Sequence, residues 1–390
     1  MKKKEVNSAR IPVYRDAGFE LYNAEITSET FGKEHDPERE PDQYIYSRYR
    51  NPTVVSAEEE IMKVEGSSWS LLAQTGMAAI DIALSIFQKG KETGPWLFFT
   101  EIYGGTISYI DAVLVARRNI DVRYFKPDGS RYDFGMFEKT VSELRPKVVY
   151  VETISNPTII VADITEVIRI AKKYSCTVIV DNTFATPFLY KPLDYGADIV
   201  IHSATKYFSG HGNLTAGVLC GNDPKIMKEA LDYRRFVGHM ISPDDAYRLQ
   251  TQIQTFTLRF QRQCRNAAKL ASFLEKSEKV KRIWYPGLEK HTTYDVAKKL
   301  FGEKGYGAMI TFDLDGKNTE DRRKKRDNFI SKVSGKIKLI PSLGDSRTIL
   351  MPVEAVWGAK YPEPGMIRLS VGFEEYGEIE EVIMKAIDSI

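Results

Sequence analysis

A lysine follows a short apolar segment at a place where hydroxyl groups and glycines gather. Residues 199–201 are apolar and β-branched, which predicts a buried strand, and Ser203, Thr205 and Lys206 come soon after it. Most lysines are solvated surface residues, so Lys206 alone would mean little. Ligands of open α/β sheets bind at the carboxyl ends of parallel strands, however. An amine there can form a Schiff base with a carbonyl compound, and the two hydroxyls can bind a phosphate group on the same molecule.

A second segment offers another place for a phosphate. The strand-like residues 70–73 lead into Thr75, Gly76 and Met77 at the start of an expected helix. Free backbone N–H groups and the helix dipole favour an anion at such a position. An ordinary strand-to-helix turn that contains a glycine is the alternative for this segment taken alone.

Two further strand ends carry groups suited to a planar aromatic cofactor. Asp181 ends the apolar segment 177–180, and Tyr103 precedes two glycines that permit close approach of a ligand. A carboxylate can pair with a protonated pyridine nitrogen, and the combination of lysine and aspartate is typical of pyridoxal 5′-phosphate sites. A capping role for Asp181 and core packing for Tyr103 are the alternatives.

Three regions of the chain differ in their patterns. Residues 1–57 contain many Arg, Glu, Tyr and Pro with little apolar periodicity, which predicts an extended arm that needs a partner surface. Residues 58–256 alternate short apolar runs with amphipathic segments, and this pattern is typical of a mostly parallel sheet covered by helices. Residues 257–390 mix strand-like and helix-like segments, which predicts a smaller α+β domain.

Two local patterns predict helices in the second half of the chain. Ser242, Pro243 and Asp245 form a capping box, so we expect a long helix to begin there and to run toward Leu274. The charged run 322–327 predicts a solvated helix face.

The composition restricts the class of partner. The 390 residues carry a formal charge of only +2, which argues against a dedicated nucleic-acid or anionic-membrane surface. Three widely separated cysteines argue against a disulfide framework, and the histidines lack the spacing of metal ligands. Because no apolar run could span a bilayer, we expect a cytoplasmic protein that acts on a small molecule and binds no nucleic acid, membrane or metal.

Nine segments, in the same order along nearly the whole chain, resemble the Cys/Met-metabolism family of pyridoxal phosphate enzymes. This family contains cystathionine synthases and lyases, methionine γ-lyase and O-acylhomoserine sulfhydrylases. The segments are YSRYRNPT, QTGMAAI, YGGT, VETISNP, VIVDNTFATP, HSATKYFSGHGN, YPGL, SLGD and GMIRLSVG. The resemblance implies the aspartate aminotransferase-like fold (fold type I), with a mostly parallel seven-stranded sheet and a smaller C-terminal α+β domain.

The resemblance also implies roles for individual residues. Lys206 would hold the cofactor covalently and then move protons between substrate carbons, while Asp181 would bind the ring nitrogen. Tyr103 would stack on the ring and assist proton transfer. The remaining cofactor contacts would be to the phosphate, from Gly76, Met77, Ser203 and Thr205 of the same chain and from Tyr46 and Arg48 of a neighbouring subunit.

For the substrate, the resemblance implies that Arg368 grips the α-carboxylate, for which a planar bidentate donor suits better than lysine. Asn156 and Ser342 would help to place the carboxylate and the lysine, with Glu152 nearby as a supporting group. Because the arm would reach a neighbouring site, the resemblance implies a homodimer, usually paired into a homotetramer, with shared active sites.

The implied reaction is γ-elimination or γ-replacement on an amino acid derived from homoserine or homocysteine. O-acetylhomoserine sulfhydrylation and β-elimination from cystathionine or cysteine are the alternatives. Gly105 stands where methionine γ-lyase typically has a cysteine, which favours the cystathionine enzymes. The segment 351–364 departs further, because Met351, Val353, Val356 and Trp357 replace residues that are usually polar in the family. An apolar pocket lining would favour a compact thioether or acyl group.

Overall fold

The computed structural model describes residues 10–34, 43–88 and 94–390. A larger sheet lies in the first two thirds of the chain and has seven strands in the order β1-β7-β6-β5-β4-β2-β3. The strands are β1 Trp69–Ala73, β2 Trp96–Phe99, β3 Val122–Phe125, β4 Val148–Glu152, β5 Thr177–Asp181, β6 Ile199–His202 and β7 Gly217–Gly221. All pairs are parallel except those that β7 makes with β1 and β6. The prediction of a mostly parallel seven-stranded sheet is confirmed.

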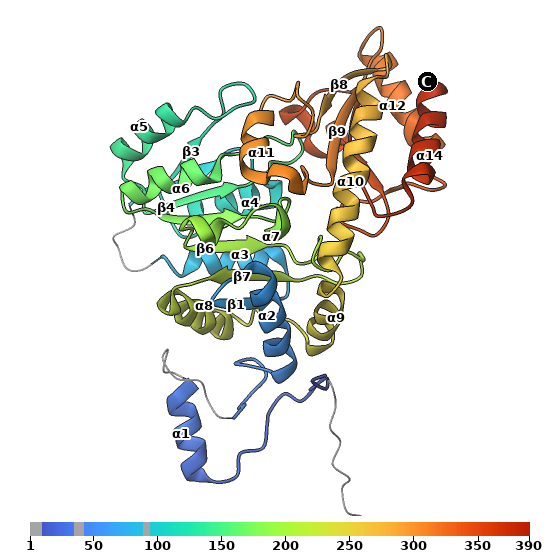
Figure 1. The fold of residues 1–390 in the computed structure, drawn as a ribbon. Coiled ribbons are helices and arrows are strands. Elements are labelled where there is room, and N and C mark those ends of the chain that lie inside the picture. The colour runs from blue at the N-terminus through green and yellow to red at the C-terminus, as the bar shows by residue number, and fades with distance from the viewer. Residues whose placement is uncertain (1–9, 35–42, 89–93) are drawn as a thin grey trace, which may run out of the picture.

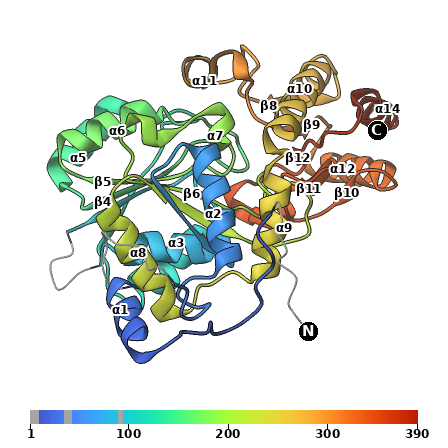
Figure 2. The ribbon, with the colours of Figure 1, turned by 60° about the horizontal axis from the view of Figure 1, so that its bottom comes forward.

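Helices cover both faces of this sheet, which explains why its central strands are buried along their whole length. Figure 2 shows α3 and α8 on one face and α5 and α6 on the other. The helical elements of this part are α2 Pro52–Glu65, α3 Gly76–Ser85, α4 Gly104–Tyr109, η1 Ile110–Val115, α5 Phe134–Leu144, α6 Ile164–Lys173, α7 Thr186–Leu189, η2 Pro192–Tyr195, α8 Pro224–Val237 and α9 Pro243–Ile253.

A second sheet of five strands lies in the last third of the chain, in the order β10-β11-β12-β9-β8. Its strands are β8 Val280–Trp284, β9 Met309–Leu314, β10 Lys338–Leu339, β11 Ile349–Pro352 and β12 Met366–Ser370. The accompanying helical elements are α10 Phe256–Glu275, α11 Tyr294–Phe301, η3 Gly302–Lys304, α12 Thr319–Val333, α13 Val353–Trp357, η4 Gly358–Lys360 and α14 Tyr376–Asp388. Apolar residues of α10, α12 and α14 form a second core with this sheet. The smaller α+β part is therefore confirmed, while the boundary at residue 256 stays a prediction.

Two expectations about helices in the second half of the chain differ from the structure. The long helix expected from Ser242 is interrupted between α9 and α10, because the Thr255 hydroxyl (3.2 Å) and the Arg259 guanidinium (3.0 Å) both donate to the Gln252 carbonyl. The charged run is not wholly solvated, since Arg326 is buried and Arg322 pairs with Asp313.

The arm is not extended throughout, because α1 (Ala24–Glu34) lies within it. Figure 1 shows α1 at the lower edge of the molecule, where Lys228 Nζ of α8 donates to the Glu34 carbonyl of α1 (3.3 Å). Elsewhere in the arm, the Phe19 N–H donates to Ile45 and the Ser47 N–H donates to Ala17, so two of its segments pair with each other. Contact of the arm with a neighbouring subunit stays a prediction.

All three cysteines, Cys176, Cys220 and Cys264, are free and buried. No helix among the described residues is both long enough and apolar enough to cross a membrane. In the same part of the chain, His, Cys, Asp and Glu side chains form no cluster that could hold a metal ion.

Candidate active site

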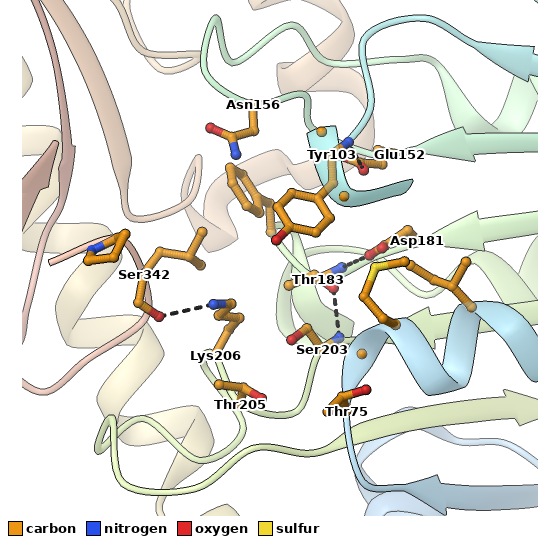
Figure 3. Close-up of a pocket in the computed structure, with 18 of the residues that line it drawn as sticks. Thr75, Tyr103, Glu152, Asn156, Asp181, Thr183, Ser203, Thr205, Lys206 and Ser342 are labelled. Atoms are coloured by element: carbon orange, nitrogen blue, oxygen red, sulfur yellow. Dashed lines mark hydrogen bonds between the residues drawn. The ribbon is translucent and has the colours of Figure 1, made fainter. Parts of the chain in front are cut away.

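A cavity of about 630 Å³ lies at the carboxyl ends of the parallel strands and reaches the smaller sheet. Figure 3 shows Lys206, Asp181, Ser203 and Tyr103 directed toward it. With the exception of Tyr46 and Arg48, every site residue predicted from the sequence lines this cavity: Gly76, Met77, Tyr103, Asn156, Asp181, Ser203, Thr205, Lys206, Ser342 and Arg368. The structure thus brings together residues that lie almost 300 positions apart in the sequence.

Lys206 lies in the turn that follows β6. Its backbone N–H donates to the Ser203 carbonyl (3.0 Å), and its Nζ donates to Ser342 Oγ (3.0 Å). Burial, together with the charge of Arg368, lowers the pKa of Lys206 to about 8. The neutral fraction near neutral pH is therefore larger than that of an exposed lysine, and the neutral amine is the form that attacks a carbonyl.

A glycine permits the approach of Ser342 to the lysine. Gly344 has φ +77°, and a Cβ at this position would lie 2.7 Å from the Tyr207 nitrogen and 2.8 Å from the Lys206 carbonyl carbon. Any side chain at 344 would push the two loops apart, because both contacts are to backbone atoms.

Asp181 ends β5 deep in the cavity. Its Oδ1 accepts from the Thr183 N–H (3.0 Å), and the Thr183 hydroxyl accepts from the Ser203 N–H (2.9 Å), as Figure 3 shows. Burial raises the pKa of Asp181, and the hydrogen bonds from Thr183 oppose this rise without cancelling it. A buried carboxyl of this kind can share a proton with a ring nitrogen, so Asp181 fits the pyridine end of the cofactor.

The start of α3 fits the phosphate end. Thr75 caps this helix by accepting from the Ala78 N–H (3.0 Å), so the helix presents its other free N–H groups to the cavity. A Cβ at Gly76 would lie 3.0 Å from Ser203 Oγ, so the glycine keeps this space open. Thr205 lines the same region, but its hydroxyl bonds to the backbone of Ala216.

Tyr103 begins α4, and its ring is half exposed in the cavity. Its N–H donates to Glu152 Oε1 (2.5 Å). Burial, reinforced by the neighbouring charge of Asp181, raises the pKa of Glu152 well above its usual range. A Cβ at Gly105 would overlap the Tyr103 ring, whereas a Cβ at Gly104 would meet nothing. The glycine at 105 therefore permits the observed ring position.

Arg368 comes from β12 of the smaller sheet and is 4% exposed. Its guanidinium donates to Asn156 Oδ1 (3.0 Å) and to the Ser342 carbonyl (2.7 Å). Its Nε has no hydrogen-bond partner within the described chain. Burial lowers the pKa of Arg368 to about 10, so the side chain remains cationic at neutral pH. A buried cation with an unpaired N–H is suited to receive a carboxylate.

Tyr46 and Arg48 lie outside the cavity of their own chain. Arg48 donates to the Arg235 carbonyl (2.9 Å), and its guanidinium lies 5.1 Å from the centre of the Tyr49 ring. Their expected role in a neighbouring site therefore stays a prediction.

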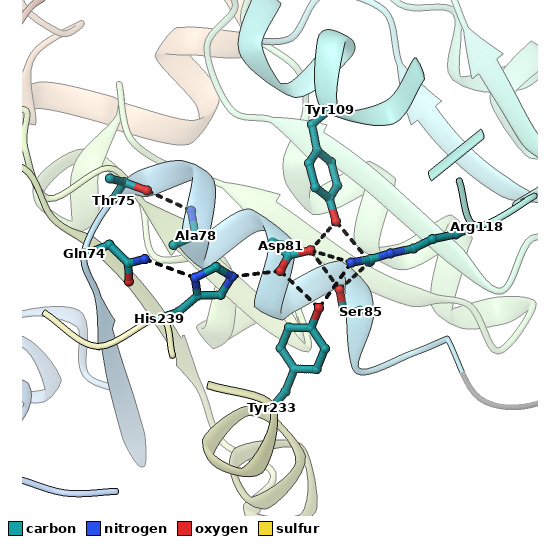
Figure 4. A network of polar contacts seen from close by, with 9 residues as sticks. All are labelled: Gln74, Thr75, Ala78, Asp81, Ser85, Tyr109, Arg118, Tyr233 and His239. Atoms are coloured by element: carbon teal, nitrogen blue, oxygen red, sulfur yellow. Dashed lines mark hydrogen bonds and ion pairs between the residues drawn. The ribbon is translucent and has the colours of Figure 1, made fainter. Parts of the chain in front are cut away.

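A partly buried polar network supports α3 from the side, and the sequence analysis did not find it. Figure 4 shows Asp81 of α3 at its centre. The Asp81 carboxylate accepts from Tyr109 (2.5 Å), Tyr233 (3.1 Å), His239 (2.9 Å) and Arg118 (3.0 Å). Burial alone would raise the pKa of Asp81, but the hydrogen bonds from His239 and Tyr109 and the charge of Arg118 hold it well below its usual range.

The network also reaches the residue that precedes the helix cap. Gln74 and His239 Nδ1 are 3.1 Å apart, and Thr75 follows Gln74. Through His239, the network therefore connects the segment that precedes α3 with Asp81 inside this helix. Its members are spread from position 74 to position 239, and no local motif connects them, so the sequence offered no signal.

Comparisons with known proteins agree with this geometry. The family model described as "Cys/Met metabolism PLP-dependent enzyme" matches residues 1–388. Cystathionine beta-lyase of Lactococcus lactis subsp. cremoris (strain MG1363) is 34% identical over 358 residues, covering 90% of each chain. L-methionine gamma-lyase of Treponema denticola is 33% identical over 408 residues, covering 100% of this chain and 94% of the relative.

Solved structures give the same result. Cystathionine gamma-lyase from Lactobacillus plantarum, complexed with L-serine, is 28% identical with a TM-score of 0.83, covering 97% of this chain and 93% of the other. Cystathionine gamma synthase from Xanthomonas oryzae pv. oryzae, in complex with cystathionine, is 25% identical with a TM-score of 0.83, covering 97% of this chain and 92% of the other. The chain belongs to the Cys/Met-metabolism family of enzymes that depend on pyridoxal phosphate.

Proposed function

We propose that this enzyme catalyses γ-elimination or γ-replacement on an amino acid derived from homoserine or homocysteine, with pyridoxal phosphate held by Lys206. The observation that carries the proposal is the position of the Lys206 amine, which shares one cavity with Asp181 and Arg368. When bound, the cofactor stabilises the electron pair left on the substrate Cα. Asp181 would hold the ring nitrogen, and Ser203 with the start of α3 would hold the phosphate.

Lys206 supplies the proton transfers that the reaction needs. γ-Elimination requires removal of a proton from Cα and then from Cβ, and a single mobile amine can serve both atoms. The pKa of about 8 suits this role, because the amine gains and loses protons readily near neutral pH. Its hydrogen bond to Ser342 Oγ (3.0 Å) gives the amine a defined resting position between transfers.

Arg368 orients the substrate. Its guanidinium is fixed by Asn156 and Ser342, so a substrate carboxylate would meet a donor that is already in place. Replacement by lysine would lose the bidentate geometry, and we expect the KM of Arg368→Lys to rise by about two orders of magnitude.

β-Elimination is the second candidate, because the relatives include a cystathionine beta-lyase at 34% identity. It uses the same lysine but omits the proton transfer at Cβ. The keto acid product separates the two reactions, since γ-elimination yields 2-oxobutanoate and β-elimination yields pyruvate.

The test is product analysis with purified holoenzyme and with Lys206→Ala. L-Methionine, L-cystathionine, O-acetyl-L-homoserine and L-cysteine are supplied separately, and keto acids are measured by chromatography. The expected result is 2-oxobutanoate from at least one substrate with the parent and none with Lys206→Ala. Pyruvate as the only keto acid would replace γ-elimination by β-elimination, and no keto acid from any substrate would overturn both eliminations.

We also infer that the active form is a cytoplasmic homodimer or homotetramer in which the arm of one subunit contributes Tyr46 and Arg48 to the site of the other. The support is that both residues lie outside the cavity of their own chain, while the cavity is lined by no arginine besides Arg368 in the described part. A phosphate dianion would gain from a second cation.

A further inference from the structure

One wall of the active-site cavity is formed by an apolar segment of the smaller sheet. Met351 of β11 and Val356 and Trp357 of α13 line it. We refer to residues 353–361, which comprise α13, η4 and Tyr361, as the lid.

Ion pairs hold one end of the lid. Glu354 accepts from Arg323 (2.5 Å) and from Arg326 (3.0 Å), both on α12. The hydrogen bond from Arg323 is the main reason why the pKa of Glu354 lies below its usual value. Because α12 packs on the smaller sheet, this end of the lid is fixed to the C-terminal part of the chain.

The other end of the lid is attached to the larger sheet. The Tyr361 hydroxyl donates to Glu101 Oε2 (2.5 Å), and Lys360 Nζ donates to the Thr100 carbonyl (3.2 Å). Glu101 follows β2 and precedes Tyr103 by two positions. The lid therefore bridges the two sheets across the cavity, and its attachment point adjoins the aromatic residue expected to stack on the cofactor.

The lid also contacts the group that would bind the substrate carboxylate. The Arg368 guanidinium lies 5.5 Å from the centre of the Trp357 ring. Met351, which precedes the lid on β11, places its Sδ 3.4 Å from a terminal nitrogen of Arg368. Trp357, Met351 and Val356 therefore form the part of the cavity surface that adjoins the group expected to hold the substrate carboxylate.

This surface offers no counter-charge to the far end of a substrate. The charged side chains that line the cavity, within the described residues, are Glu152, Asp181, Lys206 and Arg368. The Glu152 carboxyl already accepts the Tyr103 N–H, and the other three side chains have proposed roles toward the cofactor and the substrate carboxylate. A second ammonium and carboxylate would lose hydration beside apolar groups without gaining partners.

We propose that the lid is a specificity element that selects substrates with a compact, uncharged group on Cγ and rejects those that end in a second charged amino-acid group. The inference rests on the proposed function, since it concerns the same site. Trp357 and Val356 form the selective surface, and the contact of Tyr361 with Glu101 keeps that surface in place.

The test compares the binding of two ligands that contain no C–S bond. L-Norleucine has the shape of a methionine-type substrate, and L,L-2,7-diaminosuberate has the shape of a cystathionine-type substrate. Affinity is read from the change in the absorbance band of bound pyridoxal phosphate during titration of the holoenzyme. We expect the parent to bind norleucine at least about tenfold more tightly, a ratio typical of discrimination by pocket contacts.

A positive charge placed on the lid should reduce the preference for norleucine over diaminosuberate. In Val356→Arg, a guanidinium becomes available to the distal carboxylate of diaminosuberate, and we expect the ratio of affinities to fall about tenfold. Val356 is 52% exposed, so the longer side chain has room. The matched control is Val115→Arg, because Val115 is 44% exposed and does not line the cavity; its ratio should equal that of the parent.

The attachment to Glu101 is tested by Tyr361→Phe, which removes only the hydroxyl. In this variant, the ratio of the affinities for norleucine and diaminosuberate should fall. The absorbance band of bound pyridoxal phosphate, recorded without ligand, should equal that of the parent. Equal affinity of the two ligands in the parent, or a ratio unaffected by Val356→Arg, would overturn the proposal. Because neither ligand can undergo elimination, failure of the lid proposal leaves the product analysis intact, and failure of the product analysis leaves this binding result intact.

Discussion

At the scale of single residues, glycines leave the space that the larger side chains of the site occupy. Gly344 permits the loop of Ser342 to approach Lys206, and Gly105 leaves the space that the Tyr103 ring occupies. Lys206 and Tyr103 were predictable, because each follows an apolar run that ends at a sheet edge, whereas Ser342 was expected only from the family resemblance. Their exact neighbours were not predictable, because the space around a glycine depends on segments far away in the sequence.

Gly105→Ala tests the position of Tyr103. The new Cβ would overlap the ring, so the ring must move and its contact with the cofactor should weaken. We expect the dissociation constant for pyridoxal phosphate to rise about tenfold, which corresponds to the loss of one aromatic contact. Titration of the apoprotein, followed by absorbance, gives this constant. Gly104→Ala is the control, because its Cβ would meet nothing. Equal constants for the two variants would contradict the assigned ring position.

The pKa of Lys206 predicts how fast the apoprotein takes up its cofactor at different pH values. Only the neutral amine reacts, so the rate should rise through pH 8 and level off above about pH 9, since the pKa is about 8. An exposed lysine has a pKa near 10.4, so the rate for N-acetyl-lysine should still rise in that range. Stopped-flow absorbance measures both rates. A protein rate that climbs in parallel with that of the model compound would show that burial does not lower this pKa.

At the scale of elements, the larger sheet was predictable and the polar contacts between helices were not. Buried parallel strands produce apolar runs that can be read locally, as in residues 199–201. The interruption between α9 and α10 depends on Arg259, which reaches back to the Gln252 carbonyl. Likewise, Asp81 is an unremarkable acidic residue within an apolar helix until the fold brings His239 to it.

Asp81→Asn tests the support of α3. The variant leaves Arg118 without its carboxylate, so the free energy of unfolding of the apoprotein should fall by about 2 kcal/mol, and cofactor affinity should fall with it. Since the folded pKa of Asp81 is lowered, its contribution is complete above about pH 5 and is lost on acidification, so the difference between the parent and Asp81→Asn should shrink at low pH.

Urea unfolding at pH 7 and pH 4 and titration with pyridoxal phosphate measure these effects. Asp111→Asn is the control, because Asp111 is exposed and contacts only the Tyr124 hydroxyl at 3.4 Å among the described hydrogen bonds; a change within about 0.5 kcal/mol is expected. Equal unfolding free energies for Asp81→Asn and the parent would mean that the network does not stabilise α3.

At the scale of the whole molecule, the active site depends on both sheets. Lys206 belongs to the larger sheet, while Ser342 and Arg368 belong to the smaller one, and the lid connects them. Neither part contains a complete site. If the arm contributes as proposed, residues of a second subunit would also be needed to complete each site.

Hybrid oligomers test the shared site. Lys206→Ala and Arg48→Ala are each expected to be severely impaired, but a hybrid dimer would combine an intact lysine with an intact arm in one of its two sites. Random mixing of the two variants at equal amounts should therefore restore about a quarter of the parent activity. The measurement is activity after co-expression, with separately expressed and unmixed variants as controls. Activity no greater than the mean of the two variants would place Arg48 and Lys206 in independent roles.

The burial of the three cysteines has a consequence for the redox behaviour of the enzyme. Burial raises the pKa of Cys176 to about 11 and that of Cys264 to about 12, and it raises the pKa of Cys220 as well. Thiol–disulfide exchange needs an accessible thiolate, and these side chains provide neither access nor charge. The folded enzyme can therefore share a solution with small thiols and their disulfides without forming mixed disulfides, and its activity should not depend on an added reductant.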